Sequence, residues 1–166
     1  MLRVGPLSRQ LPRRAITPPF RKDYDALPGN HPTDWAARFG VDRAQFFAAY
    51  HDGQLVGGAV CIVDTLDVVR LGGDPDFALL WDLRVAVGFR GRGIGLRLLA
   101  AAETGVQQIG GVGITAETQD INVAACALYI RAGYFITRIE PGAYPDLPDE
   151  VRIIWSKAFG LLSQSG

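Results

Sequence analysis

A loop rich in glycine and arginine has the residue types and spacing that most favour ligand chemistry in this chain. Its residues are, in order, Phe89, Arg90, Gly91, Arg92, Gly93, Ile94 and Gly95. Alternating glycines let a backbone approach an anion closely, and a helix that begins here would present unpaired N–H groups and a positive dipole end. Arg90 and Arg92 would add charge-assisted hydrogen bonds. The loop predicts a pyrophosphate site; a tight turn that caps a helix and carries two solvated arginines would have the same composition.

Two common nucleotide-binding motifs do not match this loop. The dinucleotide fingerprint G-x-G-x-x-G requires a glycine where this chain, counted from Gly91, has Leu96. That fingerprint also lies near the start of its domain, whereas about half of this chain precedes the loop. A P-loop requires a lysine followed by serine or threonine, and no lysine lies near. Both classes of nucleotide site are therefore excluded.

Two separated motifs resemble those of the Gcn5-related N-acetyltransferase (GNAT) superfamily. The first is R-x-x-G-x-G, which begins at Arg90 and resembles the acetyl-CoA pyrophosphate loop of that superfamily. The second is N-x-x-A-x-x-x-Y-x-x-x-G-[FY], which extends from Asn122 to Tyr134. The motifs occur in the expected order and cover roughly residues 77–136. The resemblance implies a GNAT fold and acetyl-CoA as the donor substrate.

A narrower resemblance links the C-terminal half to streptothricin acetyltransferases. The segment E-T-Q-D-I-N-x-x-A-C-x-x-Y, from Glu117 to Tyr129, resembles a segment of that group. Asp82 and the segment 150–155 are similar to the same group. The first 75 residues, where the superfamily normally carries its acceptor-binding helices, show no comparable match. The resemblance therefore concerns the cofactor half, and the acceptor half is inferred.

The resemblance implies that acetyl-CoA lies between two splayed strands. Its pantetheine arm would bond to main-chain groups of Val85 and Val87, as an added strand does. An N–H group of Leu83 or Val85 would polarise the thioester carbonyl. A plain core strand is an alternative that is compatible with both roles. The predicted cofactor-binding residues are Leu83, Val85, Val87, Arg90, Gly91, Arg92, Gly93, Ile94, Gly95 and Asn122.

Three residues are the candidates for catalysis. By resemblance, Tyr129 is the general acid that protonates the departing CoA thiolate; a buried core tyrosine is the alternative. An alkyl amine is protonated at neutral pH, so a base or a water relay is required. Glu117 is the preferred base, through water, with Asp82 as a cation anchor or alternative base. Either acid could instead be solvated or salt-bridged, and Asn122 could be a helix N-cap as well as a cofactor ligand.

Hydrophobic periodicity predicts the elements that position these residues. An α/β fold is expected, with a mixed, mostly antiparallel twisted sheet and flanking helices, in a single domain over residues 1–166. Within it, residues 1–44 are poorly matched and residues 45–160 form the recognisable core. The predicted strands are 46–51 and 54–63, joined as a hairpin at Asp52-Gly53, then 77–87, 112–117, 134–140 and 151–157. The predicted helices are 33–39, 93–109 and 122–132, and the predicted loops are 65–76 and 141–150.

Composition excludes several other classes of protein. Seventeen basic and seventeen acidic residues cancel, so no global charge favours nucleic acid or a membrane as partner. Cys61 and Cys126 form no C-x-x-C pair, which argues against a disulfide framework or a metal site. No apolar stretch is long enough to span a membrane, and no secretory signal is recognised, so a cytoplasmic protein is expected. Among the first 22 residues the six basic ones meet no acid, which indicates either a phosphate-binding arm or a solvated segment.

The resemblance implies an acetyl-CoA-dependent N-acetyltransferase that acts by direct transfer in a ternary complex. The expected acceptor is a primary amine of a small cationic molecule such as a streptothricin-type antibiotic, and a homodimer is possible. Acetylation of a protein N-terminus or lysine is an alternative within enzymes. A CoA-binding module without catalysis is an alternative of a different class.

Overall fold

The computed structural model describes residues 31–39, 41–63 and 76–160. The basic segment at the N-terminus and most of the predicted loop 65–76 lie outside the described residues. The helices are α1 (Trp35–Phe39), α3 (Ile94–Gln108) and α4 (Val123–Arg131), with 3₁₀ turns at Pro32–Asp34, Val41–Arg43 and Val87–Phe89. The strands are β1 (Ala44–His51), β2 (Gln54–Ile62), β3 (Phe77–Val85), β4 (Gly113–Gln119), β5 (Phe135–Pro141) and β6 (Val151–Ala158).

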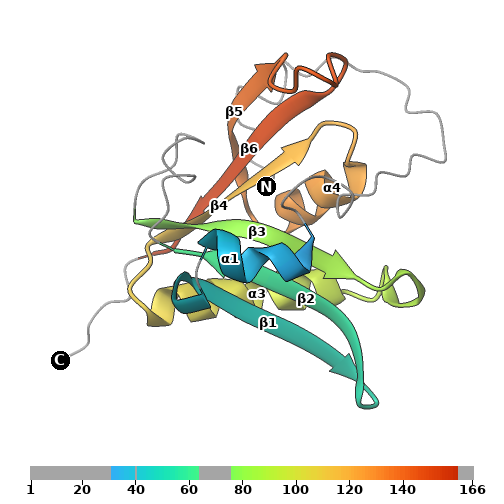
Figure 1. Cartoon of the computed structure of the whole chain (residues 1–166), viewed down its shortest axis with the longest axis vertical. Coiled ribbons are helices and arrows are strands. Elements are labelled where there is room, and N and C mark those ends of the chain that lie inside the picture. The colour runs from blue at the N-terminus through green and yellow to red at the C-terminus, as the bar shows by residue number, and fades with distance from the viewer. Residues whose placement is uncertain (1–30, 40, 64–75, 161–166) are drawn as a thin grey trace.

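The described strands form one six-stranded sheet in the order β1-β2-β3-β4-β6-β5. The β3–β4 pair is parallel and the other pairs are antiparallel. The main core lies on the face covered by α3 and α4, whereas α1 covers the opposite face through Trp35 (Figure 1). The predicted mixed, mostly antiparallel α/β fold is therefore confirmed.

A β-bulge at Trp81 changes which face the second half of β3 presents. Cys61 of β2 pairs with Leu80, and Val60 pairs with Asp82, so Trp81 is the extra residue. An extra residue reverses the alternation of side chains along a strand. Leu80 before the bulge and Leu83 after it both pack on the α3 face, whereas Trp81 packs on the α1 face. Without the bulge, Asp82 would continue the buried row that includes Leu80.

Strands β3 and β4 diverge halfway along their length. Their parallel pairing extends from Phe77–Gly113 to Leu80–Ala116 and ends there. Beyond that point β3 continues to Val85, paired with β2, and β4 continues to Gln119, paired with β6. The two strands therefore separate where the bulge interrupts β3, and the space between their unpaired segments is called the gap below. The sequence resemblance predicted this splay.

Local signals placed most elements within a few residues of their observed bounds. The hairpin turns at Asp52 and Gly53, both with positive φ (48° and 76°), as an Asp-Gly turn requires. The long strand was predicted to reach Val87, and this is wrong. β3 ends at Val85, and Val87 begins a 3₁₀ turn in which its carbonyl accepts from the N–H of Arg90. The Phe89 N–H also donates to the Ala86 carbonyl, so the chain turns before Val87 and cannot extend the strand.

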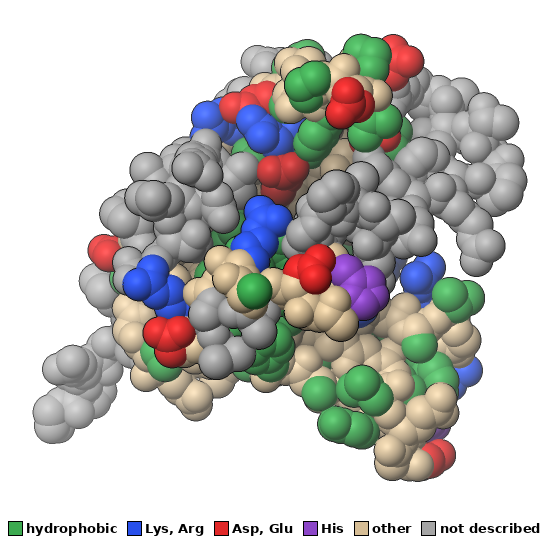
Figure 2. Space-filling model, in the orientation of Figure 1, with side chains coloured by type: hydrophobic (Ala, Val, Ile, Leu, Met, Phe, Trp, Pro, Cys, Tyr) green, Lys and Arg blue, Asp and Glu red, His purple; other side chains and the backbone are tan. Residues whose placement is uncertain are grey.

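Both outer strands of the sheet are irregular. The register of β1 against β2 shifts between Ala49 and Tyr50, and that of β5 against β6 shifts around Thr137. Hydrophobic side chains gather over the β1–β2 hairpin (Figure 2), where Phe46, Tyr50 and Leu55 are exposed. Exposed apolar patches often mark contact surfaces. The homodimer expected from the sequence stays a prediction.

Candidate functional site

The predicted phosphate loop connects the end of β3 to the start of α3. Gly91 and Gly93 have φ values of 76° and 75°, and Gly93 is the N-cap of α3. A Cβ at either position would meet nothing within 4 Å, so backbone conformation, not crowding, explains the two glycines. At Gly95, φ is not positive and a Cβ would make an ordinary contact of 3.5 Å with Leu128. The fold itself leaves room for a side chain at Gly95. A phosphate group bound at the α3 N-terminus would compete with such a side chain for space, so the glycine fits a phosphate site.

The two arginines of the loop contact neighbouring groups of the same segment. Arg90 Nε donates to the Val85 carbonyl at 3.0 Å. The Arg92 guanidinium lies over the Phe89 ring, 5.1 Å from its centroid. Both side chains are exposed at the end of the gap between β3 and β4. Their charge is therefore placed beside the exposed N–H groups that begin α3.

Main-chain groups of two predicted residues point into the gap. The Ala86 N–H donates to the Val56 carbonyl, so Ala86 and Val56 form a hydrogen-bonded pair of the antiparallel ladder. Such pairs alternate along antiparallel strands. Arg84 and Asp82, which face Gly58 and Val60, therefore direct their main-chain groups at β2. Leu83 and Val85 direct theirs away from β2, toward the side on which β4 has diverged.

Tyr129 is buried in α4, with 6% of its surface exposed. Its ring lies 5.5 Å from that of Tyr134 and 5.6 Å from that of Trp155. It belongs to the same packed cluster as Leu80 and Ala116, the last paired residues before the strands diverge. The position satisfies the core-tyrosine interpretation and also places the residue beneath the gap.

Asn122 is the N-cap of α4. Its Oδ1 accepts a hydrogen bond from the Ala125 N–H at 3.2 Å. The capping interpretation is therefore confirmed. A contact with the cofactor stays a prediction.

Asp82 is paired with Arg84 on the α1 face of the sheet. Arg84 Nε and Nη2 each lie 2.8 Å from one carboxylate oxygen of Asp82. The Arg84 guanidinium also lies over the Trp35 ring, 5.6 Å from its centroid. Asp82 is thus salt-bridged, as one of the alternatives predicted. A cationic acceptor that binds Asp82 would have to replace Arg84 as the partner of its carboxylate.

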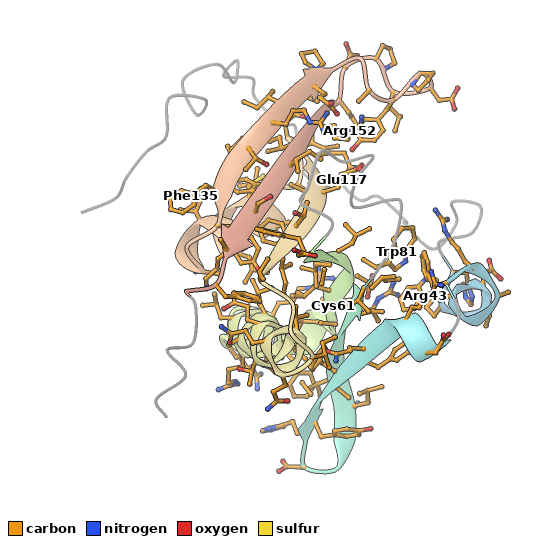
Figure 3. The ribbon with its side chains drawn as sticks, turned by 90° about the vertical axis from the view of Figure 1, so that its left-hand side faces the viewer. Arg43, Cys61, Trp81, Glu117, Phe135 and Arg152 are labelled. Carbon is orange, nitrogen blue, oxygen red and sulfur yellow. The ribbon has the colours of Figure 1, made fainter. Side chains whose placement is uncertain are left out.

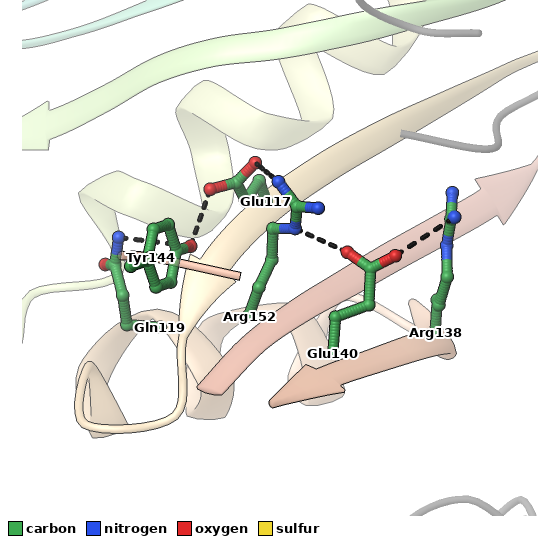
Figure 4. A network of polar contacts seen from close by, with 6 residues as sticks. All are labelled: Glu117, Gln119, Arg138, Glu140, Tyr144 and Arg152. Atoms are coloured by element: carbon green, nitrogen blue, oxygen red, sulfur yellow. Dashed lines mark hydrogen bonds and ion pairs between the residues drawn. The ribbon is translucent and has the colours of Figure 1, made fainter. Parts of the chain in front are cut away.

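Glu117 is part of a network of polar side chains (Figure 4). Tyr144 Oη donates to Glu117 Oε1 at 2.6 Å, and Arg152 Nη1 lies 3.9 Å from Glu117 Oε2. Arg152 also bonds Glu140, which pairs with Arg138. Burial raises the pKa of Tyr144 above its ordinary value, and its hydrogen bond to Glu117 adds to the shift. Tyr144 therefore remains a donor at physiological pH.

The two candidate acids share one face of the sheet. Ile114 and Ala116 pack on the α3 face, so Glu117 faces the α1 side, as Asp82 does after the bulge. Figure 3 shows Glu117 and Trp81 on this same side. Tyr129 belongs to the cluster on the other face. The structure therefore separates the candidate bases from the candidate acid, with the gap between β3 and β4 in the middle.

Sequence reasoning missed the partners of these acids. The Asp82–Arg84 spacing of two residues on a strand is a signal that could have identified that pair. Tyr144 and Glu117 are 27 residues apart, and no local pattern indicates their contact. Asp120, which follows β4, has a structural role, because its Oδ1 accepts the Val151 N–H at 2.9 Å.

The described residues contain neither a candidate metal site nor a candidate membrane span. Within 31–39, 41–63 and 76–160, no group of three or more His, Cys, Asp or Glu side chains could hold a metal ion. In this part of the chain no helix has the length and hydrophobicity needed to cross a membrane.

Comparison with known proteins identifies the family. The model of the acetyltransferase (GNAT) family matches residues 11–134, more than half of the chain. The chain belongs to the GNAT acetyltransferase family. The family assignment predicted from the loop and from the Asn122–Tyr134 motif is confirmed.

Individual relatives within the GNAT family extend the comparison. Streptothricin acetyltransferase A of Bacillus subtilis (strain 168) is 33% identical over 85 residues, which are 50% of this chain and 49% of the relative. A Bacillus anthracis str. Ames protein assigned as a streptothricin acetyltransferase, solved with acetyl coenzyme A, is 29% identical with a TM-score of 0.62, over 71% of this chain and 64% of the other. An aminoglycoside 6'-N-acetyltransferase solved with coenzyme A is 20% identical with a TM-score of 0.61, over 75% and 78%. The chain thus spans about half the length of the curated relative, and the predicted likeness to streptothricin acetyltransferases is confirmed as a likeness.

Proposed function

We propose that this protein is an acetyl-CoA-dependent N-acetyltransferase that transfers an acetyl group directly to a primary amine of a small cationic molecule. The observation that carries the proposal is the divergence of β3 from β4 after Leu80–Ala116, beside a glycine loop at the start of α3. The gap would admit an extended chain in the plane of the sheet, and the loop would hold the anion at its end.

The chain offers two kinds of group to acetyl-CoA. N–H groups from Gly91 to Gly95, with Arg90 and Arg92, would bind the pyrophosphate. Main-chain groups of Leu83 and Val85 would bind the pantetheine arm, and one of their N–H groups would polarise the thioester carbonyl. The Val85 carbonyl is bonded to Arg90, so the N–H is the more accessible of its two groups. Val87 lies beyond the end of β3 and could bond only at the mouth of the gap.

Proton transfers would proceed on opposite faces of the sheet. On the α1 side, Glu117 would take a proton from the acceptor ammonium, through water, so that the amine can attack the thioester carbonyl. On the α4 side, Tyr129 would give its phenolic proton to the departing thiolate. Cys126 lies in α4 and is partly buried, which agrees with direct transfer and not with an acetylated cysteine. Asp82 would hold a cationic group of the acceptor.

Streptothricin or a similar polyamine is the proposed acceptor. The support is the likeness to streptothricin acetyltransferases and the two acids on the α1 face. Arg84 contacts Asp82 and Arg152 contacts Glu117, so neither carboxylate is uncompensated before the acceptor binds. An acceptor ammonium would replace an arginine as the partner of a carboxylate. The expected cytoplasmic location and the single domain belong to this same proposal.

Release of free thiol from acetyl-CoA, measured on a panel of amines, tests the proposal. The panel contains streptothricin, other polycationic amines, a neutral aryl amine and a peptide with a free N-terminus. Fastest turnover with the polycationic amines is expected. Preference for the peptide would favour protein acetylation, and binding of CoA without thiol release on any amine would favour a non-catalytic module.

A further inference from the structure

The carboxylate of Glu117 is held at both of its oxygens by side chains from two other elements. Oε1 accepts from Tyr144, in the loop between β5 and β6, and Oε2 lies near Arg152 of β6. Glu117 is about one-third exposed, with 30% of its side chain accessible. A glutamate on a strand that is held at both oxygens has a restricted rotamer, and this matters for any proton transfer that requires a fixed geometry.

The hydroxyl of Tyr144 has its proton directed at Glu117. Gln119 Nε2 donates to Tyr144 Oη at 3.4 Å, so the oxygen already accepts one hydrogen bond. Its own proton is then donated to Glu117 Oε1 at 2.6 Å, a short distance typical of a charge-assisted bond. Such a donor stabilises the ionised form of a carboxylate.

The loop that carries Tyr144 is tied to the end of β4. Asp120 donates its N–H to the Val151 carbonyl, and its Oδ1 accepts the Val151 N–H. Within the loop, Leu147 N–H donates to the Tyr144 carbonyl, and Glu150 N–H donates to the Leu147 carbonyl. The position of Tyr144 relative to Glu117 is therefore fixed by main-chain bonds as well as by the side-chain contact.

We propose that Tyr144 is a positioning residue for Glu117, which orients the carboxylate for removal of the acceptor proton. This inference rests on the proposed function, in which Glu117 is the base. The charged groups around the carboxylate are Arg152 of β6 and, through it, Glu140 and Arg138 of β5. Removal of the Tyr144 hydroxyl would leave the Arg152 contact at Oε2 and would remove the hydrogen bond that restrains Oε1.

Tyr144→Phe tests the inference because it removes one hydroxyl and keeps the ring. We expect kcat to fall on the order of 10-fold, the value of one charge-assisted hydrogen bond, with KM for acetyl-CoA unchanged. Tyr50→Phe, at an exposed position of β1, is the matched control and should leave both kcat and KM unchanged.

A double-mutant cycle with Glu117→Gln separates this inference from the proposed function. If Glu117→Gln alone lowers kcat strongly, Tyr144→Phe should have little further effect in that background. Equal effects of Tyr144→Phe in both backgrounds, or a kcat for Tyr144→Phe equal to that of the parent, would overturn the positioning role. Full activity of Glu117→Gln would instead overturn the base assigned in the proposed function. CoA affinity by calorimetry confirms in each case that the variant is folded.

Discussion

Arg84 donates hydrogen bonds to both carboxylate oxygens of Asp82, which lies two residues earlier on the same face of β3. Both side chains reach that face because the bulge at Trp81 precedes them. The Arg84 side chain is 42% exposed and that of Asp82 is 19% exposed, so the pair can open toward solvent. The contact between them therefore determines how much of the Asp82 charge an acceptor can use.

Arg84→Ala is expected to lower KM for a polycationic acceptor roughly two- to fivefold, since exposed ion pairs contribute about 0.2–1 kcal/mol. Asp82→Asn should raise KM by a similar factor. Both effects should shrink as salt is added, whereas KM for acetyl-CoA should not change. Identical acceptor KM values in the two variants and the parent would remove Asp82 from the acceptor site.

Gly93→Ala should abolish tight CoA binding, because a Cβ would project from the N-cap of α3 into the space that the phosphate needs. Gly53→Ala is the matched control: its φ of 76° nearly equals the 75° of Gly93, and neither Cβ would meet an atom within 4 Å. Each variant should lose about 1–2 kcal/mol of stability from the left-handed backbone. Calorimetry with CoA should distinguish them; equal CoA affinity of both variants would contradict the phosphate-loop assignment.

Tyr129→Phe should reduce kcat on the order of 10²–10⁴-fold with little change in KM for acetyl-CoA, as expected for loss of a general acid. Tyr134→Phe is the control, since its ring lies 5.5 Å from that of Tyr129 and is also buried. Steady-state kinetics should show near-parent kcat for this control. If the Tyr129→Phe enzyme retains most of its kcat, Tyr129 is not the general acid, and water must protonate the thiolate.

Both cysteines should resist alkylation in the folded protein. Burial raises the pKa of Cys61 to about 12 and that of Cys126 to about 11, from an ordinary 9.0. The reactive thiolate is therefore scarce at pH 8, and labelling by iodoacetamide should accelerate only at more alkaline pH or on unfolding. The raised pKa values of the two thiols also stabilise the folded state, and this stabilisation is fully present below about pH 9. The free energy of unfolding should therefore fall as the pH rises from there toward 11 and 12. Mass spectrometry measures the labelling, and Cys126→Ser should retain kcat if transfer is direct.

The parts of the fold that were predicted from sequence depend on short-range signals. Asp52-Gly53 specifies a turn by its backbone preferences, and Asn122 caps α4 through an atom three residues away. Gly93 indicates the start of α3 for the same reason. In each case, the residue and the element that it determines lie within one turn of chain.

The parts that were not predicted depend on pairing between distant strands. The family resemblance implies a bulge in the long strand, but its position at Trp81 is defined only by the register of β3 against Val60 and Cys61. The end of β3 at Val85 depends on where the 3₁₀ turn forms, which overrides the strand propensity of Val87. The contact between Tyr144 and Glu117 requires β6 to lie between β4 and β5, a topology that no local pattern encodes.

The divergence of β3 and β4 also affects how the protein avoids self-association. From Trp81 onward β3 is an edge strand, and edge strands recruit strands from other molecules. Of the two outer strands, β5 carries a bulge at Thr137 that discourages such pairing, whereas the extra residue of the β1–β2 pair is Val56 of β2. The inner edge of β3 differs from them because it lies within the sheet, with β2 paired on one side and β4 continuing on the other. Arg90, bonded to the Val85 carbonyl, occupies one of its acceptors. The unpaired edge of β3 therefore lies inside the sheet and not at its outer boundary.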